Sequence, residues 1–248
     1  MYAGSRYESF SLWADEPTKK YFTLLRKYKD RVIAEIAGHD HFASFRYHTT
    51  KNVLGLADDP TIHEENFHNL IVAPSFTPWY QNNPAVSALE INEHQIPHNF
   101  RSTYWNLKET IGYTHTTPYE HLVFRDLDYT AKYGLDVLTP NALKAFKDKL
   151  LADVEMHNDY MIRKVGLDPK DPEEVNVARD IFLEKGLITK INKPGEAPLY
   201  SLWPQLCLMD SNISVAEYAT CLARDPQTHT HGSQIHYDKW HQMVDYLI

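Results

Sequence analysis

The sequence predicts an α/β fold followed by a mainly helical region, and two observations support this prediction. Short runs rich in branched and aromatic residues, which are typical of strands, concentrate in the first hundred residues after one helical pattern. Beyond that point, apolar residues recur at helical spacing between proline and glycine boundaries. We therefore expect one domain over residues 1–100 and a second over 101–248. Since no glycine- or serine-rich linker separates them, we expect the two to pack as one body.

The first half contains one expected helix and four expected strands. The helix begins near Asp15, which can cap it, and Pro17 suits its first turn. Strands, expected to lie in one sheet of an α/β sandwich, are predicted over residues 31–37, 42–50, 69–74 and 86–92.

The second half contains five expected helices. Several expected starts carry a proline or a capping aspartate, and Gly186 stops one of the helices. From about residue 125 the chain is expected to be mainly helical and packed against the sheet. The predicted helices cover residues 140–151, 153–165, 172–186, 214–223 and 238–247.

The composition of the 248 residues is that of a globular protein, with 43% hydrophobic residues and a net charge of −8. A nucleic-acid-binding protein normally carries a basic face, so we expect no nucleic-acid partner. No run approaches the about 18 apolar residues that indicate a transmembrane helix. The first residues lack the charged and apolar regions of a signal peptide, so the chain as written predicts a cytosolic protein.

The most informative segment for chemistry is Gly38-His39-Asp40-His41, which directly follows an expected strand. Two imidazoles two residues apart on such a loop can project into one cleft, and imidazole is a common ligand of zinc-like metals. Two metals about 4 Å apart can activate a water molecule and orient a phosphate. On residue types alone the alternative stays open, because Gly-His-x-His also occurs by chance in a chain with 14 histidines.

The context of this segment resembles a known family. Strand, Gly-His-x-His and strand together resemble the last metal motif of the calcineurin-like metallophosphoesterases. The run Ala-Pro-Ser-Phe-Thr-Pro at 73–78, the Asn-Asn-Pro at 82–84 and the strand after them resemble a segment of the acid sphingomyelinase-like phosphodiesterases. The similarity is closest over residues 17–92 and spans most of the chain.

This resemblance implies the carboxy-terminal half of a metallophosphoesterase α-β-β-α sandwich followed by a mainly helical subdomain. It implies that His39 and His41 each bind one of two divalent metals, expected to be zinc. It also implies that Trp79 and Asn83 line a pocket for a phosphate-ester substrate, such as one with a lipid headgroup. A packed aromatic and a turn-forming amide remain the alternatives for these two residues. No catalytic residue is expected in this chain.

The chain departs from the family pattern in ways that bear on activity. Phe42-Ala43-Ser44 follows the second histidine, where many members carry an acidic residue, and Ala85 stands where glycine often follows Asn-Pro. The family's other metal ligands would all precede this segment, and each metal needs about four ligands. We therefore expect the chain to be inactive alone. It is either the carboxy-terminal part of a phosphodiesterase whose amino-terminal half is missing, or a degenerate, non-catalytic subunit of a larger assembly.

The last fifty residues carry weaker signals. Cys207 and Cys221 would form a disulfide in an exported protein, contributing about 3 kcal/mol, with Cα atoms about 4.4–6.8 Å apart. Asn212 begins a glycosylation sequon. The resemblance implies a full-length precursor that is secreted, extracellular or lysosomal. A second candidate metal group, more simply explained as a solvated tail, consists of His229, His231, His236 and His241.

Overall fold

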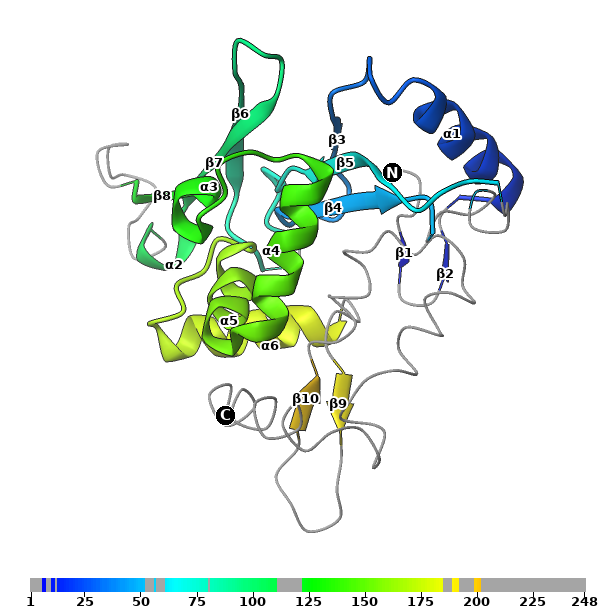
Figure 1. Ribbon diagram of the computed structural model, residues 1–248. Helices are drawn as coiled ribbons and strands as arrows, with labels where there is room; N and C mark the ends of the chain where they lie inside the picture. Colours follow the sequence, from blue (N-terminus) through cyan, green and yellow to red (C-terminus); the bar gives the residue numbers. More distant parts are fainter. Residues whose placement is uncertain are drawn as a thin grey trace.

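The computed structural model describes residues 6–7, 10–11, 13–51, 56, 61–79, 81–110, 122–184, 189–191 and 199–201. These residues form a mixed α/β structure with two small three-stranded sheets and several helices (Figure 1). The predicted α/β class is therefore confirmed. In the part of the chain so described, no helix is long and apolar enough to cross a membrane.

The first sheet has the strand order β3-β5-β4. Its strands are β3 (Glu35–Ala37), β4 (Ser44–Thr49) and β5 (Asn66–Val72). The central strand β5 runs parallel to β3 and antiparallel to β4, so the turn between β3 and β4 lies at one end of the sheet. This topology places residues 38–43 between the end of β3 and the start of the buried strand β4.

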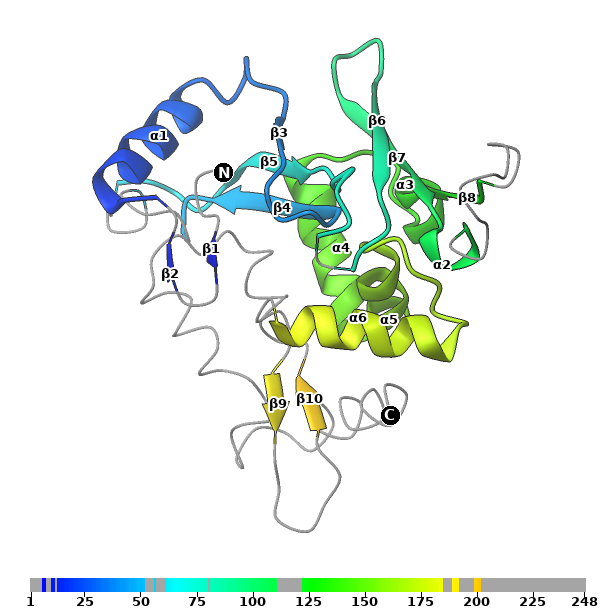
Figure 2. The same ribbon diagram turned by 180° about the vertical axis from the view of Figure 1, so that it is seen from behind.

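The first helix, α1 (Asp15–Lys27), covers part of this sheet and lies away from α5 and α6 in both views (Figures 1 and 2). Its residues Phe22 and Leu25 pack with Phe67 of β5, which gives the helix its buried face. The predicted cap is wrong by one position. Asp15 is the first helical residue, where its charge complements the helix dipole, and Ala14 occupies the capping position.

Two strand boundaries also differ from the prediction. The chain after α1 forms a turn that lasts through residue 31, where the amides of Arg31 and Val32 donate to the carbonyl of Tyr28 at 2.8 and 3.0 Å. The strand predicted over 31–37 therefore begins only at Glu35. The strand predicted over 69–74 begins at Asn66 and ends at Val72.

The second sheet contradicts the expectation of a single sheet. It is antiparallel, with the order β6-β7-β8, and consists of β6 (Ala85–Ile91), β7 (Pro97–Trp105) and β8 (Phe124–Asp128). The predicted strand over 86–92 is present but pairs with β7, which was not predicted. Because β7 runs through residue 100, the expected domain boundary lies inside a strand.

Helices dominate the described residues after β8, as predicted. The capping side chains of Thr139 and Asp153 accept hydrogen bonds from the amides of Ala142 and Met156, which fixes two helix starts. The helices of this half are α2 (Leu107–Thr110), α3 (Tyr129–Tyr133), α4 (Pro140–Ala152), α5 (Val154–Arg163) and α6 (Pro172–Glu184). The helices predicted over 214–223 and 238–247 lie outside the described residues.

Short strand pairs complete the described elements. They are β1 (Arg6–Tyr7) with β2 (Phe10–Ser11), and β9 (Thr189–Ile191) with β10 (Leu199–Ser201).

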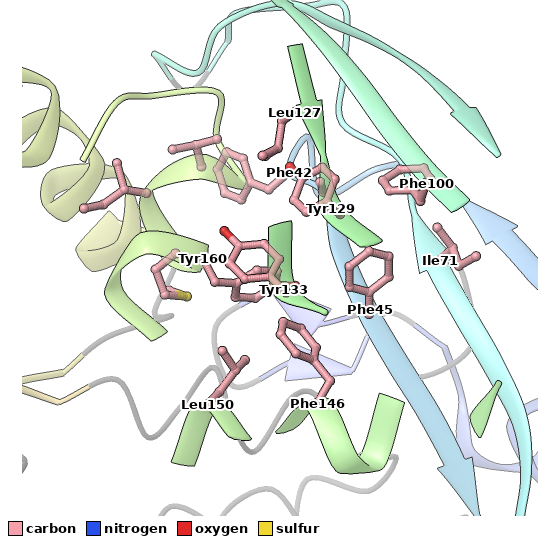
Figure 3. Close-up of a cluster of buried hydrophobic side chains, with 14 of the residues drawn as sticks. Phe42, Phe45, Ile71, Phe100, Leu127, Tyr129, Tyr133, Phe146, Leu150 and Tyr160 are labelled. Carbon is pink, nitrogen blue, oxygen red and sulfur yellow. The ribbon is translucent and has the colours of Figure 1, made fainter. Parts of the chain in front are cut away.

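The main core joins residues from both sides of position 100 (Figure 3). The ring of Phe45 on β4 packs edge-on against Phe100 at 5.6 Å and Tyr129 at 5.7 Å between centroids. It also contacts Phe146 of α4 at 6.3 Å and Tyr160 of α5 at 6.4 Å. Edge and offset contacts of this kind add to the gain from burying the rings. The first sheet and the helices of the second half thus share one core.

Candidate functional site

His39 and His41 lie in the turn between β3 and β4, residues 38–43, which we call the histidine turn. This confirms the prediction that both lie on a loop at a strand end. His39 is exposed and His41 is half-buried. Neither is a fully buried core histidine, although the Nδ1 atom of His41 is buried.

The backbone of the histidine turn is unusual. His39 and His41 have φ angles of 95° and 67°, in the left-handed region that residues other than glycine rarely adopt. A residue held there costs about 1–3 kcal/mol, and such residues cluster at functional sites. Contacts with the rest of the protein must therefore maintain this conformation.

Three hydrogen bonds from residues outside the turn anchor it. Asp40 accepts from the Arg46 guanidinium on β4 at 3.1 Å. The carbonyl of His41 accepts from the amide of Ser75 at 3.2 Å, and the amide of Ala43 donates to the carbonyl of Lys164 at 3.0 Å. The turn is thus tied to its own sheet, to the loop after β5 and to the end of α5.

Two buried cations surround Asp40. Arg46 and Lys164 are 6% and 2% exposed, whereas the Asp40 side chain is 24% exposed. Burial lowers the pKa of Lys164 to about 7, although the nearby Asp40 carboxylate opposes this shift and Arg46 adds to it. Asp40 is therefore a negative group that offsets buried positive charge beside the histidine turn.

The described residues do not by themselves fit a two-metal centre. Within them, no group of three or more histidine, cysteine, aspartate or glutamate side chains is arranged to hold a metal ion. Asp40, the carboxylate between the two histidines, is hydrogen-bonded to Arg46. The histidine turn offers two imidazoles, which is half of one tetrahedral shell.

The loop over residues 73–84 lies beside the histidine turn through the contact of Ser75 with His41. Trp79 is 78% exposed, so it is not packed in the core. Asn83 is 4% exposed, and its side chain donates to the carbonyl of Gly166 at 2.7 Å and accepts from the amide of Leu107 at 3.1 Å. These contacts fit the structural alternative for Asn83, because both ends of its amide are bound within the protein.

A second polar cluster was not predicted. Glu35 of β3 accepts hydrogen bonds from Tyr21 of α1 and from the ring of His48, whose Nε2 lies 2.9 Å from Oε2. His68 is the direct cross-strand neighbour of His48, with ring centroids 6.0 Å apart, and its Nε2 lies 3.8 Å from the same carboxylate oxygen. Both histidine rings are buried under α1, where Phe22 packs on His48 at 4.8 Å.

The electrostatics of this cluster favour a carboxylate beside a neutral imidazole. Burial lowers the pKa of His68 to about 4, more than nearby Glu35 raises it, and His48 lowers it further. Burial by itself would raise the pKa of Glu35, but its interactions with His48, Tyr21 and His68 bring that pKa below its ordinary value. The sequence signal for this cluster was a glutamate in an otherwise apolar run, Ile-Ala-Glu-Ile-Ala.

The remaining predicted residues lie outside the described residues: Cys207, Asn212, Cys221 and the histidines His229, His231, His236 and His241. Comparison with known proteins gives no family. No protein-family model matches the chain, and no curated protein matches it.

Proposed function

We propose that this chain is the carboxy-terminal part of a two-metal phosphoesterase that hydrolyses phosphodiesters, and that His39 and His41 are its contribution to the metal ligands. The observation that carries the proposal is the histidine turn. Two imidazoles separated by one residue lie at the end of a strand, in a strained backbone that the protein maintains by contacts from three elements. Strain of this kind is typical of functional sites.

The finer fold assignment belongs to the same proposal. The sheet β3-β5-β4, with α1 on it, would be part of one half of the α-β-β-α sandwich, and the histidine turn would lie at its ligand-bearing edge. The loop over 73–84 would border the substrate pocket, with the exposed ring of Trp79 available to a phosphate ester such as a lipid headgroup. Asn83 would act by holding this loop to Gly166, in the segment that follows α5.

The metals in this proposal are a pair of divalent ions, expected to be zinc, and the described residues hold too few ligands for them. The other ligands would come from the amino-terminal half of the parent enzyme. That parent would be exported, with Cys207 bonded to Cys221 and Asn212 glycosylated.

An activity assay tests the proposal. The 248-residue chain is incubated with bis(p-nitrophenyl) phosphate and zinc, and we expect no hydrolysis above that of zinc in buffer. Robust zinc-dependent turnover by this chain alone would show that its catalytic ligands have been misplaced.

The positive arm uses the coding sequence upstream of Met1. If it encodes Asp-x-His and Asn-His segments in frame, the joined protein should hydrolyse the same substrate. His39→Ala or His41→Ala should then lower its turnover by orders of magnitude. His94→Ala, in the exposed turn between β6 and β7, is the matched control and should retain activity.

The second candidate function is a degenerate, non-catalytic subunit of a larger assembly. One specific observation favours it. Asp40 and Asn83, two polar residues near the candidate site, form hydrogen bonds to other residues of the protein. On this hypothesis the upstream sequence lacks further metal motifs. His39→Ala then leaves the properties of the assembly unchanged.

A further inference from the structure

We propose that Asp40 and Arg46 form a positioning pair, which holds His39 and His41 in the left-handed backbone that presents their imidazoles. What the imidazoles bind rests on the proposed function, whereas the positioning itself rests on the geometry of the turn. Neither residue touches the ligand in this proposal. Both act through the two histidines.

Asp40 lies between two strained residues. His39 and His41 adopt φ angles of 95° and 67°, in the left-handed region that is strained for residues with a side chain. The side chain that lies between them is the one best placed to oppose relaxation. Asp40 is fixed at its Oδ2 by the guanidinium of Arg46, 3.1 Å away.

Arg46 is a rigid anchor for Asp40. Arg46 is a residue of β4, it is 6% exposed, and its Cα neighbour across the sheet is Leu70. A guanidinium is planar and permanently charged, so a buried one holds a carboxylate in a fixed direction. A buried charge that loses its partner is strongly destabilised, which makes the pair costly to break.

The Asp40–Arg46 pair acts on a different part of the turn from the other anchors. The bonds of Ser75 with His41 and of Ala43 with Lys164 join backbone groups, so they fix the end of the turn whatever the side chains are. The Asp40–Arg46 contact joins two side chains and fixes the middle of the turn. Substitution can therefore remove it while the backbone anchors stay in place.

Nuclear magnetic resonance of the labelled full chain tests the positioning. Intraresidue amide–Hα NOEs, which are strong when φ is positive, together with Cα and Cβ shifts report the sign of φ at His39 and His41. In Arg46→Met we expect at least one of the two histidines to lose its left-handed signature. The matched control is Arg101→Met, which breaks the exposed pair of Arg101 with Glu90 and should leave both signatures unchanged.

Zinc binding, measured by calorimetry on the same proteins, is the second readout. Loss of a residue that orients a metal ligand typically lowers affinity 10–100-fold, so we expect about a tenfold weaker binding in Arg46→Met. Arg46→Lys, which keeps the charge but loses the fork, should recover part of that affinity. If Arg46→Met does not fold, Asp40→Asn replaces it, because that change removes only the charge of a residue whose side chain is 24% exposed.

The outcomes separate this proposal from the proposed function. Unchanged left-handed signatures together with unchanged zinc affinity would overturn the positioning role, even if His39 and His41 bind zinc. A changed backbone in a chain that binds no zinc at these histidines would support the positioning role and count against the metal site.

Discussion

The buried cluster under α1 predicts a defined sensitivity to acid. His68 is 2% exposed, and its pKa falls from about 6.5 to about 4, chiefly because burial disfavours the charged ring. Between these two pH values the unfolded chain binds a proton that the folded protein does not. The free energy of unfolding must therefore decrease as the pH falls through this window, and the loss is complete below pH 4.

The size of the effect follows from the shift. A difference of about 2.5 pKa units corresponds to about 3 kcal/mol, of which about 2 kcal/mol is lost between pH 7.5 and pH 5. His157, whose pKa burial lowers to about 3, contributes in the same direction, and nearby Lys164 adds to that shift. The test must therefore isolate His68.

The substitution His68→Gln removes this titration and keeps a polar side chain on β5. Urea unfolding, followed by tryptophan fluorescence at pH 7.5 and pH 5, gives the free energy of unfolding of both proteins. The wild type should lose about 2 kcal/mol more than His68→Gln between the two pH values, because the contribution of His157 cancels. His94→Gln, at a position 74% exposed, should behave as the wild type. An equal loss in the wild type and His68→Gln would refute this account of the cluster.

Further predictions concern packing and a buried ion pair. Gly166→Ala should lower the free energy of unfolding by about 2–5 kcal/mol, because φ is 77° at this position and the new Cβ would lie 2.1 Å from the Tyr104 ring. Gly38→Ala is the control, since no atom lies within 4 Å of its new Cβ, and it should have little effect. Thermal unfolding of both variants measures the difference. Glu174→Ala should cost about 2–3 kcal/mol by urea unfolding, since Glu174 is 3% exposed and accepts from Arg125 at 2.9 Å; an unchanged midpoint would contradict this.

Local signals predicted much of the fold. Helices α4, α5 and α6 follow their proline and capping residues closely, because a helix start depends on side chains within a few positions of one another. The position of the histidine turn was also predictable, since a glycine directly follows the residues of β3. These features require no knowledge of distant contacts.

Features that depend on distant contacts were not predictable. The division of the strands between two sheets depends on β7. Its buried residues Phe100, Ser102 and Tyr104 alternate with polar ones, but the serine interrupts the apolar side of the strand pattern. Strand register is likewise invisible in one sequence, so nothing indicated that His48 would lie opposite His68.

The same limit applies to the candidate site. The sequence identified the two histidines of the turn by their spacing, but the anchors of the turn come from β4, from the loop after β5 and from the end of α5. The buried guanidinium of Arg46 is six residues from Asp40, a spacing without a recognisable motif.

The central claim, that the histidine turn is one part of a metal site, is tested most directly by zinc calorimetry of the 248-residue chain and its His39→Ala/His41→Ala variant. For the unsubstituted chain we predict a zinc-binding free energy far smaller than that of a complete structural zinc site, which is about 10–16 kcal/mol. In the variant we predict that zinc binding is lost. His229→Ala/His231→Ala is the control and should bind zinc as the wild type does. Zinc binding that persists undiminished in the His39→Ala/His41→Ala variant would contradict the claim.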